Sequence, residues 1–227
     1  MDIHTDEEKD ALWETMAQIY ERGGALYPVH MLRKEFQSLI VEKQKSADEI
    51  QIEEVFAELF ARKGVCAGKE MISGVCRKFR ESSTEYIRLY PGVHELMTGL
   101  KKQGRSVYLL SNAQRVFTAH ELEMLEIEPY FDGIFLSSDY GVKKPNQKFF
   151  GAMVSECGLT PGECLMIGND ENCDIAGGKR AGMGTIYLHT NLSPEYTWAV
   201  VPDYAVWNPM ESVEEVIGVI EKIEAKL

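Results

Sequence analysis

The sequence predicts an α/β protein whose core is a mostly parallel sheet, preceded by an all-helical N-terminal domain. Apolar residues recur at helical spacing up to about residue 82, and short apolar runs alternate with helical stretches from residue 86 onward. The chain has 227 residues, 44% of them hydrophobic, which suits one core with a smaller appendage. We therefore expect a helical domain at 1–85 and an α/β core at 86–227.

Four amphipathic helices are expected in the first domain. Each has apolar residues on one face: Leu12, Met16, Ile19 and Tyr20; Leu32, Phe36, Leu39 and Ile40; Ile52, Val55, Phe56, Leu59 and Phe60; Met71, Ile72, Val75 and Phe79. Thr5 with Glu8, and Ser46 with Glu49, have the spacing of a capping box, which predicts helix starts at Thr5 and Ser46.

Five short strands are expected in the core. They are the apolar runs at 106–110, 133–136, 164–167, 185–188 and 204–206. Helical stretches separate most of these runs, and this alternation is typical of βαβ units with a parallel sheet. Gly104 follows two lysines and is predicted to end a helix just before the first strand.

The composition excludes several classes of partner. The formal net charge is −12, and Lys and Arg do not cluster, so neither a nucleic acid nor an anionic membrane is expected as a partner. The five cysteines include no CxxC pair, which favours reduced thiols over a zinc site or disulfides. The sequence shows no signal peptide and no apolar membrane span, so a cytoplasmic location is expected.

Polar residues follow three of the predicted strands. Ser111 and Asn112 end the first strand, where a hydroxyl and backbone N–H groups at a helix start would suit an anion; taken alone, Ser111 is more often an ordinary N-cap. Lys144 precedes a proline after the second strand, although an isolated lysine is usually solvated. Asp170 and Asp174 follow the third strand and offer oxygen ligands for Mg²⁺, although single carboxylates there are often helix caps.

In this combination the chain resembles the haloacid dehalogenase-like hydrolases, a superfamily dominated by phosphatases. Leu109 to Asn112 resembles the second motif of the family, Gly141 to Pro145 the third, and Ile167 to Asp174 the fourth, while Tyr90 to Val93 resembles the entry into the core. The resemblance covers essentially the whole chain. It implies a doubly wound, Rossmann-like core sheet, with residues 5 to about 82 forming a helical cap over the active site.

The resemblance also implies roles for individual residues. Ser111 and the backbone N–H of Asn112 would bind phosphoryl oxygens, and Lys144 would neutralise their charge. Asp170 and Asp174 would bind Mg²⁺. The family commonly has an aspartate directly after the loop glycine, where this chain has Asn169, so the metal ligand is either Asn169 or Asp170.

The first motif of the family has no counterpart in this sequence. That motif is an apolar strand ending in Asp-x-Asp, whose first carboxylate attacks phosphorus and whose second acts as general acid and base. No apolar run precedes Trp13, so we expect the chain to begin after this motif. The strand would lie centrally, between 106–110 and 164–167. Without it, each buried unpaired group costs about 1–3 kcal/mol against a total stability of about 5–15 kcal/mol, so this exact chain is expected to be marginal and inactive.

Three functions remain open at this stage. The leading hypothesis is a Mg²⁺-dependent phosphomonoesterase that acts on a small phosphorylated metabolite through an aspartyl phosphate. A family member that binds a phosphate ligand or a protein without catalysis is the first alternative, favoured by Asn169 and by the missing nucleophile. A haloacid dehalogenase is the second, although the acidic loop argues against it. The substrate and the oligomeric state do not follow from the sequence.

Overall fold

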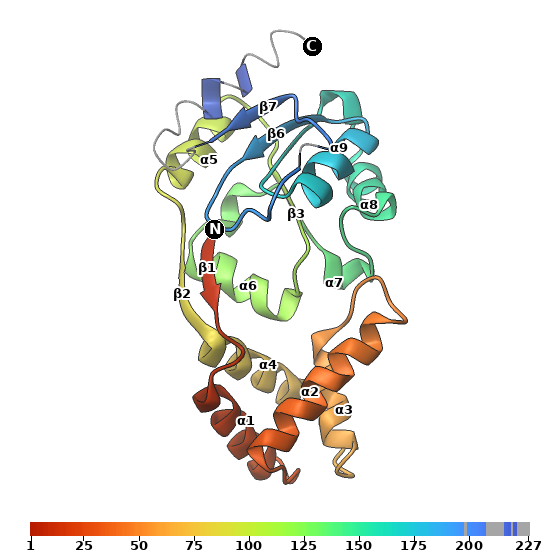
Figure 1. Cartoon of the computed structure of the whole chain (residues 1–227). Helices are drawn as coiled ribbons and strands as arrows, with labels where there is room; N and C mark the ends of the chain where they lie inside the picture. Colours follow the sequence, from red (N-terminus) through yellow and green to blue (C-terminus); the bar gives the residue numbers. More distant parts are fainter. Residues whose placement is uncertain (198, 208–215, 219, 222–227) are drawn as a thin grey trace. The chain divides into compact units, whose positions relative to one another are not determined.

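The computed structural model describes residues 1–197, 199–207, 216–218 and 220–221 (Figure 1). The chain divides into two compact units. The first comprises Met1–Arg88 and Ala113–Leu125, and the second Leu89–Asn112 and Glu126–Leu227. The helical N-terminal part thus gathers into one unit, joined by a helix from later in the chain. Its role as a cap stays a prediction, as do the domain boundaries at 85 and 86.

The first unit is built from five helices and a two-stranded ribbon among its described residues. The elements are β1 (Asp2–Thr5), α1 (Asp10–Arg22), α2 (Val29–Gln44), α3 (Ile52–Ala61), α4 (Lys69–Ser83), β2 (Thr84–Arg88) and α6 (Arg115–Met124). Strands β1 and β2 pair in antiparallel fashion, with Ile3 opposite Ile87. The four helices predicted before residue 83 are all present.

The apolar faces of these helices meet in one core. Trp13 of α1, Phe36 of α2, Phe56 of α3 and Phe79 of α4 lie with neighbouring ring centroids 5.2 to 5.9 Å apart. All four side chains are buried. Aromatic rings of this size bury a large apolar area, so this cluster contributes substantially to the stability of the unit.

Both predicted capping boxes are wrong. Thr5 lies in β1 opposite Thr84, and α1 begins only at Asp10. Ser46 lies just beyond the end of α2, while α3 starts at Ile52. The N–H of Ile52 is instead bonded by the side chain of Gln114, which is distant in sequence. A residue distant in sequence thus takes the place of a local cap, and the spacing of residues near Ser46 could not predict this contact.

The second unit holds the predicted alternation of strands and helices. Its elements are α5 (Val93–Lys102), β3 (Tyr108–Ser111), η1 (Glu128–Tyr130), β4 (Gly133–Leu136), α7 (Ser137–Tyr140), α8 (Gln147–Cys157), η2 (Pro161–Glu163), β5 (Leu165–Gly168), the π-helix η3 (Glu171–Ala176), α9 (Gly177–Arg180), β6 (Gly184–Leu188) and β7 (Tyr204–Val206). Gly104 follows the end of α5 at φ +73°, a conformation that favours glycine, as the sequence predicted.

All strands of the second unit run parallel, which confirms the predicted α/β fold. They form two sheets within the described residues, β3–β4 and β5–β6–β7. Tyr108 pairs with Gly133 in the first sheet, and Met166 pairs with Thr185 in the second. No ladder joins β3 to β5. The expected single sheet is therefore divided between the two strands that carry the second and fourth sequence motifs.

The strands that border this division are less buried than the strand inside the larger sheet. Three consecutive residues of β6, Thr185–Tyr187, are buried, whereas only Leu110 of β3 and Met166 of β5 are. Leu110 and Met166 nevertheless belong to one apolar cluster, together with Phe149 and Phe150 of α8. One helix layer therefore packs against both sheets.

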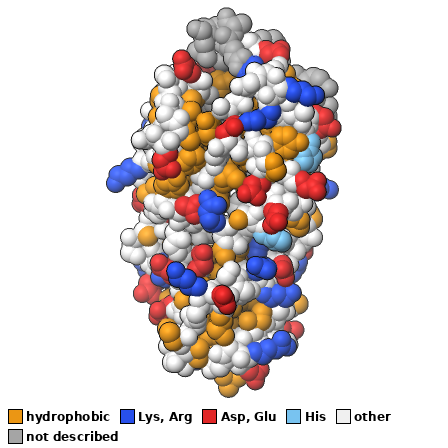
Figure 2. All heavy atoms as spheres, turned by 180° about the vertical axis from the view of Figure 1, so that it is seen from behind, with side chains coloured by type: hydrophobic (Ala, Val, Ile, Leu, Met, Phe, Trp, Pro, Cys, Tyr) orange, Lys and Arg blue, Asp and Glu red, His pale blue; other side chains and the backbone are white. Residues whose placement is uncertain are grey.

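The described residues hold neither a disulfide nor a helix long and apolar enough to cross a membrane. All five cysteines are free thiols, and Cys76 is buried in the first unit while Cys66 is exposed. None of the described helices combines the length and apolar character that crossing a bilayer requires. Figure 2 shows basic and acidic side chains interspersed on one face, with apolar patches between them.

Candidate active site

The end of β3 presents Ser111 and Asn112. Helix α6 begins at Arg115 after an extended Gln114, so Ser111 is the last residue of the strand and not a helix N-cap. The hydroxyl of Ser111 makes no hydrogen bond to a described residue. The side chain of Asn112 is fully engaged with Lys144, since Oδ1 accepts from the Lys144 N–H at 2.7 Å and Nδ2 donates to the Lys144 carbonyl at 2.9 Å.

Lys144 is a buried lysine, 8% exposed, and not the solvated side chain that an isolated lysine would be. Its Nζ donates to the carbonyl of Leu110 on β3 at 2.7 Å and to Oδ1 of Asp174 at 2.7 Å. Gly141, at φ +65°, ends α7 and turns the chain into the segment that carries Lys144. The ammonium thus joins the ends of both sheets at one point.

Asp174 forms a buried ion pair with this ammonium. Its side chain is 7% exposed, and that of Lys144 is 10% exposed. Its second oxygen, Oδ2, accepts from the N–H of Asp170 at 3.1 Å. A buried pair of this kind is held by geometry and by additional hydrogen bonds, because desolvation opposes it. Both carboxylate oxygens have a partner.

Gly168 is required by the close approach of Asp174. A Cβ on Gly168 would lie 2.1 Å from Oδ2 and 2.3 Å from Cγ of Asp174. The last residue of β5 must therefore lack a side chain so that the carboxylate can pack against the backbone. The glycine in the Ile167–Asp174 sequence pattern thus has a direct steric cause.

Asp170 caps the π-helix that follows. Its Oδ1 accepts from the N–H groups of Asn172 at 2.8 Å and Cys173 at 2.7 Å. The cap alternative considered for the loop carboxylates therefore holds for Asp170, and it does not hold for Asp174. Burial, then the nearby Asp170 carboxylate, raises the pKa of the Cys173 thiol to about 11. The carboxylate edge is thus flanked by a protonated thiol.

Asn169 lies between β5 and Asp170, and its Nδ2 donates to the Thr190 hydroxyl at 3.2 Å. Its Oδ1 oxygen makes no hydrogen bond to a described residue. Asn169, Asp170 and Asp174 together supply hard oxygen donors, the type that Mg²⁺ prefers, and Mg²⁺ is commonly bound by one or two carboxylates with water and substrate phosphate. The donor chemistry fits Mg²⁺, although no group of three His, Cys, Asp or Glu side chains is arranged as a metal cluster among the described residues.

Most of the predicted site residues are connected by direct contacts. Asn112 bonds Lys144, Lys144 bonds Asp174, and Asp174 bonds Asp170. Ser111 and Asn169 adjoin this chain of contacts in sequence without a side-chain bond to it. Two contributors were not predicted, the Leu110 carbonyl and the Thr190 hydroxyl. The Leu110 carbonyl could not be predicted because every residue type has a backbone carbonyl. The Thr190 hydroxyl was missed because Thr190 follows β6, a strand that carries none of the sequence motifs.

Comparison with known proteins gives a family match. The model of a family described as haloacid dehalogenase-like hydrolase matches residues 28–188. Human N-acylneuraminate-9-phosphatase is 26% identical over 166 residues, which cover 73% of this chain and 65% of that protein. Glyceraldehyde 3-phosphate phosphatase of Pyrococcus furiosus is 28% identical over 122 residues, 52% of this chain and 51% of that protein. The match to these two curated relatives thus spans about half to two thirds of their length.

Two solved structures are similar in fold. The 2-haloacid dehalogenase of Pseudomonas syringae has a TM-score of 0.66 at 17% identity and covers 96% of this chain and 95% of its own. The putative HAD-hydrolase YfnB of Bacillus subtilis, solved bound to magnesium, has a TM-score of 0.55 at 19% identity and covers 97% and 95%. At these identities the likeness concerns the fold alone, so the chemistry has to be argued from the residues.

Proposed function

The chain belongs to the haloacid dehalogenase-like hydrolase family, and from this premise we propose that it hydrolyses phosphomonoesters of small metabolites. The names of the two relatives support this proposal, since both are phosphatases of small phosphorylated compounds. The identity of the substrate is not part of the proposal, because only part of each relative aligns with this chain.

The observation that carries the proposal is the fixed ammonium of Lys144. Buried lysines are rare unless paired, and this one is held by Asp174 and by the Leu110 carbonyl at the carboxyl ends of β3 and β5. Ligands of open α/β sheets bind at this edge. A positive charge fixed there before the substrate arrives suits a phosphoryl group, whose transfer depends on positioning and charge neutralisation.

The neighbouring groups suit the remaining phosphoryl oxygens. The Ser111 hydroxyl, which makes no hydrogen bond to a described residue, would donate to one oxygen, and the N–H of Asn112 to another. The Asn112 side chain would keep Lys144 in place through its two bonds to the backbone of that residue. Ser111 and Lys144 would thus bind substrate, while Asn112 contributes its N–H and positions the lysine.

Mg²⁺ is the metal that we propose for the acidic loop. Asp174 is its most buried carboxylate, and Asn169 offers an amide oxygen from the adjoining position. Oδ1 of Asp170 already accepts two N–H groups as a cap, whereas each oxygen of Asp174 accepts one bond and keeps a second acceptor position. We therefore favour Asn169 with Asp174 as ligands, and Asp170 as the residue that shapes the loop. When bound, the metal would supply positive charge to the phosphoryl oxygens.

As nucleophile of the proposed reaction we propose an aspartate, the residue that the family resemblance implies at the end of a parallel strand between β3 and β5. The family resemblance implies such a strand, and the division of the described strands into two sheets is consistent with it. The half-buried residues of β3 and β5 are also consistent with it, because inner strands of parallel sheets are normally buried on both faces. Attack by this carboxylate on phosphorus would form an aspartyl phosphate and break the ester P–O bond, and the alcohol would leave after taking a proton from a general acid. Water would then hydrolyse the aspartyl phosphate, which releases phosphate and restores the carboxylate.

The experiment that tests this proposal measures phosphate release. Protein from the natural reading frame, with any residues encoded in frame before Met1, is assayed with Mg²⁺ on a panel of phosphomonoesters beside the 227-residue chain. We expect Mg²⁺-dependent turnover by the longer protein and a loss of about 10²-fold in S111A, with S46A as the unchanged serine control. A protein that is inert on the whole panel would contradict the proposal.

A non-catalytic binding function is the second candidate, and Asn169 favours it. An amide oxygen is neutral, so it should hold Mg²⁺ more weakly than the carboxylate that is common in the family at this position. Phosphate binding without turnover by the longer protein would support this candidate. The dehalogenase alternative predicts that haloacids release halide and that this release persists in the presence of a chelator. Halide release is measured on the same two protein preparations.

A further inference from the structure

A second candidate site lies in the first unit, apart from the residues described above. The C-terminal half of α4, the strand β2 and the helix α6 enclose a groove of about 280 Å³. None of the predicted catalytic residues lines it, and the proposed reaction makes no use of it. A volume of this size accepts a small organic molecule.

One wall of the groove is apolar and firmly supported. Val116 and Phe117 of α6 line it and pack against the buried core of the unit. The ring of Phe117 stacks on Phe79, with centroids 6.4 Å apart. Met124, 51% exposed, extends the wall toward solvent. A ligand that fills the groove would therefore present an apolar body to α6.

Glu121 supplies an unmet hydrogen-bond acceptor in the same wall. The residue is only 5% exposed, and its Oε1 accepts from Nε of Arg80 at 2.5 Å. Its other oxygen, Oε2, is buried and has no hydrogen-bond partner among the described residues. Buried carboxylate oxygens normally accept a hydrogen bond, so a ligand that donates one to Oε2 would be stabilised here. A charged donor such as an ammonium group bonds a carboxylate about twice as strongly as a neutral donor does.

Arg77 supplies the complementary charge. It lies one turn before Arg80 on α4, so both face the groove, and it makes no ion pair within the described part of the chain. The other acidic residues of the groove are already neutralised, Glu81 by Lys78 at 3.2 Å and Glu85 by Lys9 at 3.0 Å. The unmet groups are thus one carboxylate oxygen and one guanidinium, both on residues that line the groove beside its apolar wall.

We propose that this groove binds an α-amino acid with a large apolar side chain. The ammonium group would donate to Oε2 of Glu121, the carboxylate would accept from Arg77, and the side chain would cover Val116 and Phe117. A simple amine would meet repulsion from Arg77 and Arg80, and a simple carboxylate would leave Oε2 unpaired. Only a zwitterion with an apolar body can bond the Glu121 oxygen, pair with the Arg77 guanidinium and cover the apolar wall at once.

The test is a calorimetric titration of the 227-residue chain with L-phenylalanine and three analogues. Phenethylamine lacks the carboxylate, 3-phenylpropionate lacks the ammonium, and L-alanine lacks the ring. We expect L-phenylalanine to bind and each analogue to bind about tenfold more weakly or worse, since each loses one charged hydrogen bond or the apolar contact. Equal affinity of either charged analogue, or no binding of L-phenylalanine, would overturn the proposal.

Two pairs of variants locate the binding. E121Q and R77Q should each weaken L-phenylalanine binding about tenfold or more, whereas E70Q and K69Q, at the start of α4 and outside the groove, should leave it unchanged. Full affinity in E121Q would refute the assignment to this groove. If circular dichroism shows that E121Q does not fold, the analogue series on the unchanged chain still decides the question.

Discussion

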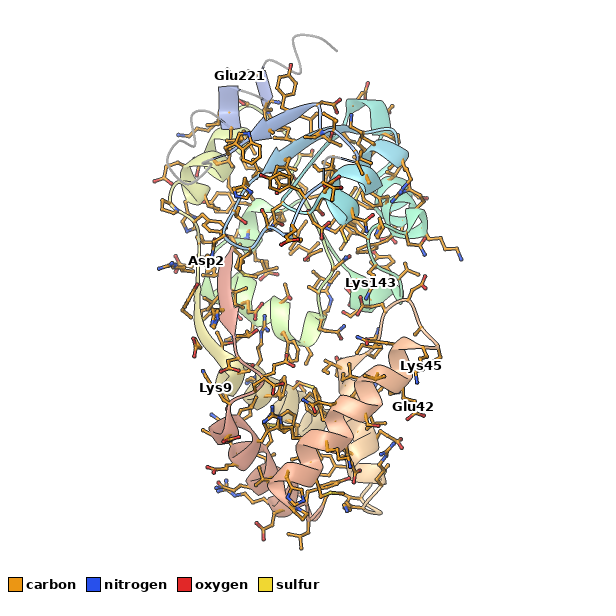
Figure 3. The ribbon with its side chains drawn as sticks, viewed as in Figure 1. Asp2, Lys9, Glu42, Lys45, Lys143 and Glu221 are labelled. Atoms are coloured by element: carbon orange, nitrogen blue, oxygen red, sulfur yellow. The ribbon has the colours of Figure 1, made fainter. Side chains whose placement is uncertain are left out.

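At the scale of single residues, the buried pair of Lys144 and Asp174 is the feature with the largest predicted effect. Replacing Lys144 by Met leaves the Asp174 carboxylate buried without its cation, which should lower the free energy of unfolding by about 3–5 kcal/mol. K143M is the matched control. Lys143, labelled in Figure 3, is the exposed neighbour, so this variant should stay within about 0.5 kcal/mol of the parent.

Urea unfolding of both variants measures this difference. Adding D174L to K144M removes the stranded charge, so the double variant should recover part of the lost stability. If K144M unfolded at the same urea concentration as K143M, the ion pair would contribute nothing and the buried ammonium would need another explanation.

Gly168 gives a prediction that depends on sterics alone. G168A places a methyl group 2.1 Å from Oδ2 of Asp174, so the carboxylate or the strand must move, and we expect a loss of about 1–3 kcal/mol. G151A is the control, because nothing lies within 4 Å of a Cβ at that position in α8, and alanine should stabilise the helix by about 0.5–1 kcal/mol. Thermal unfolding of the two variants should shift in opposite directions, and a stable G168A would refute the close approach.

The cysteines allow a prediction on reactivity and pH. Burial, with a smaller contribution from Glu53, raises the pKa of the Cys76 thiol to about 12. Compared with an ordinary thiol near pKa 8.5, its thiolate at pH 8 is rarer by about three orders of magnitude. A disulfide reagent should therefore label exposed Cys66 rapidly and Cys76 only after unfolding.

The direction of the pH effect on stability follows from the same shift. The folded thiol keeps its proton above pH 8.5 while the unfolded thiol loses it, so stability contributed by Cys76 declines as pH rises from about 8.5 toward 12. Mass spectrometry of the labelled chain identifies the modified residues, and C66S should abolish the rapid phase. Rapid labelling of Cys76 in the folded chain would show that it is not buried.

The charged residues of the site were easier to predict from the sequence than its amide side chain. The sequence pointed to Lys144, Asp170 and Asp174 because charged residues in the loops after predicted strands, taken together, resemble the family motifs. The Asn112 side chain was not, since the sequence pointed only to its N–H, whereas its amide holds the Lys144 backbone. The exchange of bonds between residues 112 and 144 depends on two loops meeting in space, which residue order does not encode.

At the scale of elements, the start of α3 distinguishes local capping from long-range capping. The side chain of Gln114 accepts from the Ile52 N–H at 3.0 Å and donates to the Ile50 carbonyl at 2.8 Å. Q114A should therefore cost about 1–3 kcal/mol, because buried backbone groups lose their partners. S46A, which removes the residue that the sequence predicted as the cap, should be nearly neutral.

Chemical denaturation of Q114A and S46A decides between the two views of this helix start. A larger loss in S46A would restore the capping box and contradict the bonds of Gln114. The comparison also measures how strongly α6 stabilises the helices that precede it in the chain.

The strands were predicted more accurately than the helix starts. The expected runs at 133–136 and 204–206 coincide with β4 and β7, and the other strands differ by one or two residues at their ends. Short apolar runs between polar loops have few alternative structures, so their positions follow from composition. Helix starts depend on which group bonds the first N–H, and that group can come from anywhere in the fold.

At the scale of the whole molecule, the sequence predicted the helical and α/β parts but not their exact membership. Helix α6 follows β3 in the chain, yet it belongs to the helical unit, where Arg80 of α4 bonds Glu121 and Phe117 stacks on Phe79. Its modest amphipathic pattern gave no reason to separate it from the core. The described parallel strands form two sheets, and the strand expected between 106–110 and 164–167 stays a prediction.

The central claim is that Ser111, Lys144 and the acidic loop form one site for a phosphoryl group. The most direct test is the affinity of the 227-residue chain for inorganic phosphate, measured by phosphorus NMR with and without Mg²⁺. We predict binding that Mg²⁺ strengthens and that S111A weakens about tenfold, while S46A leaves it unchanged. Absence of phosphate binding, or binding that neither Mg²⁺ nor S111A affects, would contradict the claim.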